Sequence, residues 1–183
     1  MTSFTIHTPE TASEEGKKSL EKAKSTMGMV PNMIAGLAES PQAAEAYMAL
    51  SHFFVKSSLT PEQRHVVWFT INAEHNCEYC MAGHTGIAKM DKIDDAIVET
   101  ARAVQAYDNQ KLEALRQFTL SMVRKRGWLE DDEVQLFLNA GFTKANVFDV
   151  LIGIAHKTMS NYANHLIKTP LDPFAKGFAW SKP

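Results

Sequence analysis

The sequence has few cysteines, little net charge and no long apolar run, and each shortage narrows its possible function. A formal net charge of −2 over 183 residues gives no electrostatic reason to expect nucleic acid or an anionic membrane as partner. No apolar run approaches the roughly 18 residues that a membrane-spanning helix needs. The first residues also lack the basic and apolar regions of a secretory signal, so we expect a cytoplasmic protein.

A sustained alternation of apolar and polar residues is also missing, and this absence argues against a β-sheet. Helix signals are frequent instead: Ser40 precedes Pro41 as cap and first residue, and Thr60-Pro61-Glu62-Gln63 has the form of a capping box. We therefore predict an all-α fold, with helices over residues 13–28, 30–40, 41–58, 60–76, 77–90, 92–106, 109–126, 130–139 and 144–168.

The domain organisation is expected to be simple, because the chain shows no low-complexity linker, composition shift or clear internal repeat. Residues 1–183 are predicted to form a single domain. Within it, residues 1–40 are expected to be a helical arm and residues 60–90 to carry the core motif.

Both cysteines of the chain lie in the stretch EHNCEYCMAGHT, residues 74–85. If a helix capped by Asn76 begins at Cys77, its turn of about 100° per residue places Cys77, Cys80 and His84 on one face, with Tyr79 pointing away. Free N–H groups and the helix dipole in the first turn favour a thiolate there. His84 could then take the proton of Cys80, and Cys77 could resolve a sulfenic acid formed on a peroxide.

Two other interpretations of the cysteine pair stay open at this point. A structural zinc site needs four ligands, and the pair with His84 supplies three, although the chain has other histidines. The two thiols could instead be inert core residues, because free cysteine is among the most buried residue types. The spacing and the reducing compartment expected for a cytoplasmic protein favour redox chemistry without a metal.

The stretch NCEYCMAGHT, together with LTPEQRHVVWFTINAEH before it, resembles the core motif of the alkylhydroperoxidase D-like group of the carboxymuconolactone decarboxylase family. GMVPNMIAGLAESPQAAEAYMAL and NYANHLIKTPLDPF resemble signatures of its peroxidase-related members. The resemblance implies an all-α fold, homo-oligomers that are commonly trimers or hexamers, and peroxide reduction without a bound cofactor. It also implies that Cys80 is the peroxidatic thiol, Cys77 the resolving thiol and His84 the base.

Two positions depart from the family pattern. His65 stands where the best-studied hydroperoxidases have a relay glutamate, and Tyr79 stands where they have a histidine before the second cysteine. Glu62 lies one helical turn before His65, and Glu74 is close to the cysteines in sequence. We therefore hold Glu62, His65, Glu74 and Tyr79 as candidates for a proton relay, with His65 able to titrate near neutral pH.

The last long helix carries a polar stripe, in which Asn161, Asn164, His165 and Lys168 share one face. Asn164 or His165 could lie over the thiols or at a pocket mouth, but a solvated or subunit-facing stripe is the competing interpretation. Apolar walls of a pocket could come from large side chains that otherwise serve the core, namely Met29, Met33, Met48, Phe53, Phe54 and Trp68.

Three functions are compatible with these features. The first is a thiol-dependent alkylhydroperoxide reductase, with peroxide as substrate and an external dithiol of thioredoxin or lipoyl type as reductant. The second is a lactone decarboxylase or isomerase on the same scaffold without thiol chemistry. The third is a redox sensor whose disulfide changes oligomerisation or partner binding.

Overall fold

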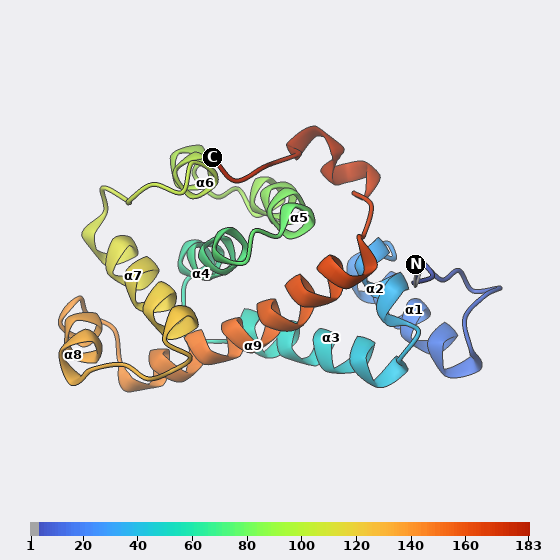
Figure 1. The fold of residues 1–183 in the computed structure, drawn as a ribbon, viewed down its shortest axis with the longest axis horizontal. Helices are drawn as coiled ribbons and strands as arrows, with labels where there is room; N and C mark the ends of the chain where they lie inside the picture. Colours follow the sequence, from blue (N-terminus) through green and yellow to red (C-terminus); the bar gives the residue numbers. More distant parts are fainter. Residues whose placement is uncertain (1–3) are drawn as a thin grey trace.

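Helices form the fold of residues 4–183, the part of the chain that the computed structural model describes (Figure 1). No β-strand occurs in this range, so the predicted all-α class is confirmed. No helix in the described part combines the length and apolar character needed to cross a membrane. The elements are α1 (Glu14–Met27), α2 (Asn32–Leu37), α3 (Pro41–Val55), α4 (Pro61–Glu74), α5 (Glu78–Met90), α6 (Asp95–Arg102), α7 (Gln110–Arg124), α8 (Asp131–Asn139), α9 (Lys144–Ile167) and the 3₁₀ helix η1 (Pro173–Phe178).

The helix starts follow the capping residues of the sequence. The Thr60 side chain accepts the N–H of Gln63, and the Gln63 side chain accepts the N–H of Thr60, which completes the predicted capping box. Ser40 caps α3 in the predicted way, with Pro41 as its first residue. The range predicted at 92–106 is too long, because Asp94 caps α6 and Val104 adopts a positive φ that ends it.

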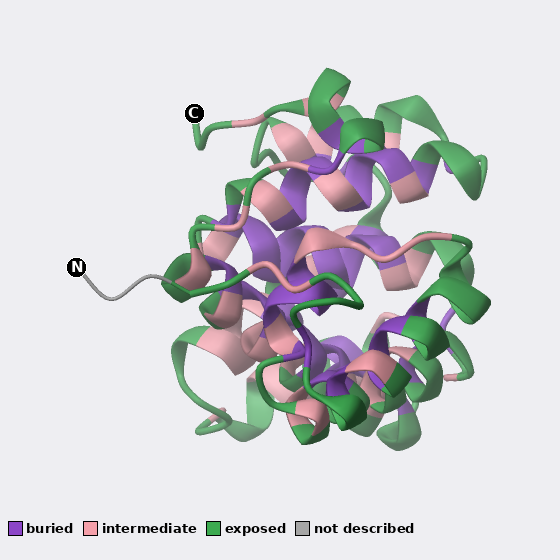
Figure 2. Ribbon diagram, turned by 90° about the vertical axis from the view of Figure 1, so that its right-hand side faces the viewer, coloured by how far each residue is buried: buried purple, intermediate pink, exposed green. Residues whose placement is uncertain are grey.

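Helix α4 lies at the centre of the molecule and is the most buried element (Figures 1 and 2). It packs against α7, α9, α5 and α6, and its residues from His65 to Ala73 are buried without interruption. A Cβ on Gly153 of α9 would lie 2.9 Å or less from atoms of Phe54 and Val67. The close approach of α9 to α3 and α4 therefore depends on the missing side chain at this glycine.

The segment after α9 crosses over α5 and ends beside α6 (Figure 1). The Arg102 guanidinium donates to the carbonyls of Phe178 and Ala179, and the Trp180 indole N–H donates to the carbonyl of Arg102. Within this segment η1 packs on α5, where the Phe174 ring comes within about 3 Å of a Cβ position on Gly86. The pattern of the sequence did not predict this helix or its place over the cysteine-bearing element.

Candidate active site

The two cysteines lie at the start of α5, and the chain turns sharply just before them. Asn76 has a φ of 53°, a left-handed conformation that asparagine tolerates better than most residues. Asn76 therefore links α4 to α5, and the predicted cap at this residue is wrong by one position. Cys77 is the cap of α5, and its Sγ accepts the N–H of Cys80 at 3.4 Å. Both cysteines are free thiols and both are buried.

Helix α9 supplies the polar groups around Cys80. The Asn164 amide donates to the Cys80 Sγ at 3.2 Å, so the structure places Asn164 over the thiols, as one of the two interpretations of the polar stripe expected. Burial by itself raises the pKa of Cys80. The hydrogen bond with Cys77, the charge of Lys157 and hydrogen bonds with Asn164 and Ser160 outweigh it and lower the pKa to about 7. These groups therefore favour the thiolate form of Cys80.

Cys77 has the opposite character. Its hydrogen bond to Cys80 and its burial raise its pKa above the usual value, because one negative charge on the pair disfavours a second. Cys77 thus stays a protonated thiol while Cys80 ionises. This asymmetry suits one attacking and one resolving thiol.

Lys157 on α9 is the least expected member of the site. Its side chain is 1% exposed, and its Nζ lies 2.9 Å from Nε2 of His84. Within residues 4–183, no carboxylate lies within ion-pair distance of Lys157. Burial, the charge of Lys157 and the neighbouring His65 and His156 lower the pKa of His84 well below its usual value, so His84 is neutral and its Nε2 accepts a hydrogen bond from the Lys157 ammonium.

A cavity of about 410 Å³ opens onto Cys80, His84 and Lys157. Its walls are largely apolar. Met29, Met33 and Trp68 line it as predicted, whereas Met48, Phe53 and Phe54, which were also predicted, do not. The walls also include Met27, Pro31, Ile34, Tyr47, Ser51, Val55, Tyr79, Gly83, Ile87, Met90, Asp91, His156 and Phe174.

His156 forms part of the cavity wall beside Lys157. Its Nδ1 accepts the indole N–H of Trp68 at 3.2 Å, and its ring lies against Tyr47 with a centroid distance of 4.6 Å. Burial and the charge of Lys157 lower the pKa of His156 well below its usual value. His156 is therefore neutral with its proton on Nε2, a buried atom without a protein partner in the described part of the chain.

Helical spacing alone predicted that Tyr79 points away from the site, and this prediction is wrong. Its ring lines the cavity, and its hydroxyl donates to Asp172 at 2.5 Å while accepting the N–H of Met33. Asp172, which is buried, also accepts the N–H of Asn32. Tyr79 therefore ties α2 and the C-terminal segment to the helix that carries Cys80.

The other three relay candidates lie apart from the thiols. Glu62 is exposed in the first turn of α4, and Glu74 makes a two-pronged ion pair with Arg124. His65 is buried and its Nε2 lies 2.9 Å from Asp91 at the cavity rim. Its ring centroid is 6.5 Å from that of His84. Geometry therefore supports neither carboxylate as the relay and leaves His65 next to the site without contacting Cys80.

The rest of the predicted polar stripe separates into inner and outer residues. Asn161 is buried beside His75, whereas His165 is exposed and turned away from Cys80. Lys157 lies on the inner face of the same stripe, one and two turns before Asn161 and Asn164. Extending the stripe by one turn in the sequence would have placed Lys157 on it, without showing that its side chain is buried. Within the described residues, no group of three histidine, cysteine or acidic side chains is placed to hold a metal ion.

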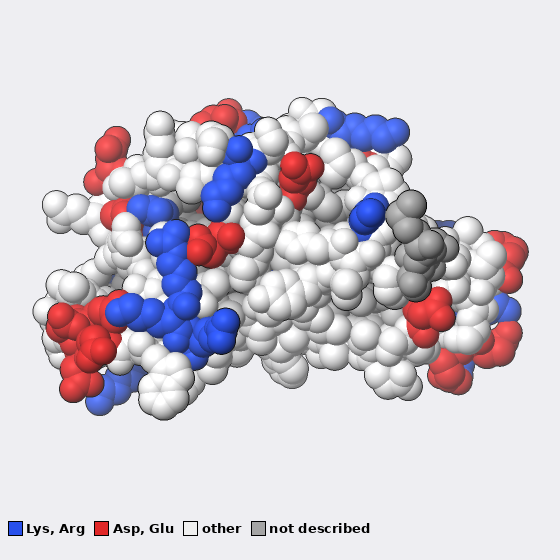
Figure 3. Space-filling view, viewed as in Figure 1, with Lys and Arg blue, Asp and Glu red and all other residues white. Residues whose placement is uncertain are grey.

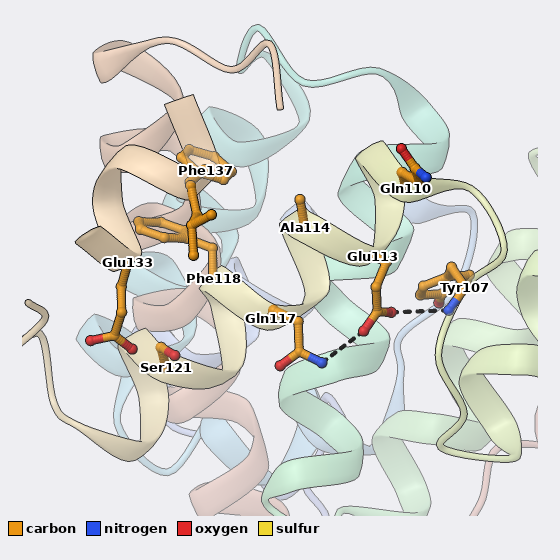
Figure 4. A pocket seen from close by; sticks show the side chains of 10 residues that line it. Tyr107, Gln110, Glu113, Ala114, Gln117, Phe118, Ser121, Glu133 and Phe137 are labelled. Atoms are coloured by element: carbon orange, nitrogen blue, oxygen red, sulfur yellow. Dashed lines mark hydrogen bonds between the residues drawn. The ribbon is translucent and has the colours of Figure 1, made fainter. Parts of the chain in front are cut away.

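A larger cavity, of about 540 Å³, lies between α7 and α8 and shares no residue with the thiol cavity. Its floor is formed by Phe118 and Phe137. Figure 4 shows that Glu113 at its edge is bound by Gln117 and by the backbone of Tyr107. It holds neither a thiol nor a histidine, whereas the smaller cavity holds both.

Comparison with known proteins gives a family match for the segment that carries both cysteines. Residues 41–120, which include both cysteines, match the model of the carboxymuconolactone decarboxylase family, so the predicted resemblance is confirmed over this range. No curated protein matches the sequence.

Solved structures share the fold over nearly the whole chain. A peroxidase-related protein of Ralstonia eutropha JMP134, described as an alkylhydroperoxidase AhpD core, aligns with a TM-score of 0.80 and 17% identity over 93% of this chain and 92% of its own. A peroxidase-related protein of Silicibacter sp. TM1040 has a TM-score of 0.79 and 18% identity over 96% and 93%. A cysteine-to-alanine variant of the debrominase Bmp8 in complex with 2,3,4-tribromopyrrole has a TM-score of 0.78 and 15% identity over 97% and 95%. At these identities the likeness concerns the fold.

Proposed function

Because residues 41–120 match the carboxymuconolactone decarboxylase family, we propose that the protein is a thiol-dependent peroxidase that reduces hydroperoxides at Cys80. The observation that carries the proposal is the state of this thiol. Cys80 has a pKa lowered to about 7, lies beside a protonated second thiol and borders an apolar cavity. Nucleophilic attack requires the thiolate, and this site supplies it at neutral pH.

The reaction begins with attack of the Cys80 thiolate on the terminal oxygen of a hydroperoxide. The O–O bond breaks, the alkoxide leaves with a proton as the alcohol, and Cys80 becomes a sulfenic acid. The Cys77 thiol then attacks the sulfenic sulfur and water leaves, which produces a disulfide. An external dithiol reduces the disulfide by exchange and returns both cysteines to the starting state.

The cavity walls support organic hydroperoxides as substrates in preference to hydrogen peroxide. Methionine, isoleucine and aromatic side chains dominate the lining, and an apolar body gains free energy by leaving water for such a surface. Methionine side chains also adapt to differently shaped partners. The site therefore suits a range of alkyl and aryl groups.

A peroxide-consumption assay with several dithiol donors tests the proposal. Cys80→Ser should remove turnover, and Cys77→Ser should allow at most a single turnover because its sulfenic acid has no resolving thiol. Ser121→Ala, in the larger cavity, is the matched control and should retain full activity. Full turnover by Cys80→Ser would contradict the proposal.

The same set of variants, tested with other substrates, distinguishes the alternative functions. A lactone substrate consumed by the protein without both cysteines would indicate an enzyme that does not use thiol chemistry. Reversible disulfide formation with negligible turnover for every donor would indicate a redox sensor. Since a debrominase shares the fold, a bromopyrrole is included, and bromide release without any peroxide consumption would also overturn the peroxidase proposal.

The outer face of α9 supports a homo-oligomer as the working form. Phe148, Leu151, Tyr162 and Leu166 are exposed along this helix, and their spacing places them near one stripe. Figure 3 shows few charged side chains over the middle of this face, whereas charges gather toward both ends of the molecule. Sedimentation velocity of the wild type and of Leu166→Glu tests the assembly, and a monomeric wild type would contradict it.

A further inference from the structure

The burial of Lys157 is costly, and its immediate contacts do not offset that cost. An ammonium group removed from water is costly unless a nearby anion compensates it. Lys157 is 1% exposed, and its hydrogen-bond partner is the neutral ring of His84. A hydrophobic side chain of similar length would fill the same space without this cost.

The groups that face the Lys157 end of the cavity come from several helices, and most are neutral. Burial holds the pKa of Tyr47 on α3 above its usual value and lowers those of His84 on α5 and His156 on α9. His75, the cap that ends α4, lies outside the cavity lining, and burial lowers its pKa too. The pKa of the capping thiol Cys77 is raised as well.

Two carboxylates lie near the cavity, but each has its own partner. Asp91 at the rim binds His65, and Asp172 accepts hydrogen bonds from Tyr79 and Asn32. The remaining anion is the Cys80 thiolate, on which the charge of Lys157 acts. Lys157 and Cys80 thus place opposite charges on the wall of one cavity.

We propose that Lys157 is the acid of the reaction, which holds Cys80 as a thiolate before attack and then protonates the leaving oxygen. This inference rests on the proposed peroxidase function. The thiolate attacks the hydroperoxide, the O–O bond breaks, and the alkoxide takes a proton from the Lys157 ammonium. The products are a sulfenic acid, a neutral amine and an alcohol, so the step removes both buried charges and needs no proton from solvent.

The later steps restore the charge pair. Attack of Cys77 on the sulfenic acid releases water and leaves a disulfide beside the neutral amine. An external dithiol then delivers two protons and two electrons. One proton returns to Cys77, the other to Lys157, and Cys80 is again a thiolate.

His84 acts through Lys157 in this scheme and is a positioning residue. Its Nε2 accepts from the Lys157 Nζ at 2.9 Å, and its low pKa keeps this nitrogen free of a proton. The ring therefore directs the ammonium without competing for its proton. His84→Gln retains an acceptor oxygen and should preserve most of the effect of Lys157, whereas His84→Leu should not.

The first test measures the thiol without peroxide. Iodoacetamide alkylation of the Cys80 peptide is followed by mass spectrometry against pH in the wild type, Lys157→Met and Lys157→Gln. Removal of a nearby cation disfavours the thiolate, so the midpoint should move to higher pH by about one unit or more, a roughly tenfold loss of rate at neutral pH. Lys144→Met, an exposed position on the same helix, is the control and should leave the midpoint in place.

The second test separates proton donation from thiol ionisation. At a pH where Cys80 is ionised in every variant, single-turnover rates are measured with an alkyl hydroperoxide and with a peracid, whose carboxylate leaves without needing a proton. Lys157→Met should lose about 100-fold or more with the alkyl hydroperoxide and far less with the peracid. A merely structural role would lower both rates equally.

The outcomes distinguish this inference from the proposed function. Equal losses with both oxidants, or an unchanged alkylation midpoint in both neutral variants, would overturn the role of Lys157 even if the wild type is an active peroxidase. A wild type that reacts with neither oxidant would overturn the peroxidase function and the acid role together. Circular dichroism of both variants establishes that they fold.

Discussion

Two of the cavities in the described part of the chain, the thiol cavity and the one between α7 and α8, differ both in size and in how their polar groups are paired. The cavity between α7 and α8 is larger, about 540 Å³ against about 410 Å³, yet its charged side chains are neutralised locally. Glu113 pairs with Arg116 and Glu133 with Lys125. The smaller cavity holds a buried lysine without a carboxylate and histidine nitrogens without partners. Unsatisfied buried polar groups are costly, so they indicate a candidate active site better than volume does.

The largest expected effect of a substitution away from the thiols lies in the floor of the larger cavity. Phe137 is buried and stacks on Phe118 and Phe142 with centroid distances of 4.0 and 4.4 Å. Phe137→Ala should lower the free energy of unfolding by about 3–5 kcal/mol, as measured by urea denaturation. The alkylation midpoint of Cys80 in the folded protein should not change, and a shift in that midpoint would show that the two cavities are coupled.

The thiol cavity should make the protein sensitive to acid. His84 and His156 have pKa values below the usual 6.5, so below about pH 6.5 the unfolded chain binds protons that the folded protein does not. Their contribution to stability is present above pH 6.5 and is lost as the pH falls, by up to about 1.4 kcal/mol per pH unit for each group.

Urea denaturation at pH 7, 6 and 5 measures this loss. His84→Gln and His156→Gln should each flatten the pH dependence, because glutamine does not titrate. His52→Gln, at an exposed position, should leave it as in the wild type. An identical slope in all four proteins would show that the buried histidines are not the cause.

Filling one cavity at a time sharpens the comparison of function. A Cβ on Gly83 would have no atom within 4 Å, and Gly83 lines the thiol cavity. Gly83→Phe should therefore reduce the rate with a bulky hydroperoxide about tenfold, or about 1.4 kcal/mol in the barrier, with less effect on hydrogen peroxide. Ala114→Phe fills the larger cavity and should change neither rate, and equal losses in both variants would contradict the assignment of the substrate cavity.

The smallest expected effect is that of a substitution at Tyr107 in the larger cavity. Unlike Glu113 and Glu133 there, the Tyr107 hydroxyl is buried and has no partner in the described part of the chain. Tyr107→Phe removes a polar group that gains nothing from burial, so the free energy of unfolding should stay within about 1 kcal/mol or rise slightly. Urea denaturation measures it. A clear destabilisation would indicate a hydrogen bond at this hydroxyl and weaken the contrast between the cavities.

Much of the fold could be predicted from local signals. The capping box at Thr60 and the Ser40-Pro41 pair act over a few residues, and both are present in the structure. Errors arose where the backbone turns, as at Asn76, whose left-handed conformation moves the start of α5 by one residue. The helix η1 and its position on α5 had no periodic signal to predict them.

The sequence was enough to predict which thiols belong to the candidate site, but not which side chains surround them. Spacing placed Cys77, Cys80 and His84 together, and resemblance suggested which thiol attacks, a role that stays a proposal. Asn164 was one of two alternatives until its amide was found 3.2 Å from the Cys80 sulfur. Lys157 was missed, because nothing local distinguishes a lysine that turns inward from one that faces water.

The sequence by itself therefore determined the all-α class, the main helix boundaries and the pairing of two thiols in one helical turn, because each depends on neighbours a few residues apart. Only the tertiary structure decided what makes the thiols differ. Lys157 lies 73 residues from the histidine that it binds, and Asn164 lies 84 residues from Cys80. Burial and charge depend on these distant contacts, so the lowered pKa of Cys80 arises from the packing of α9 against α5.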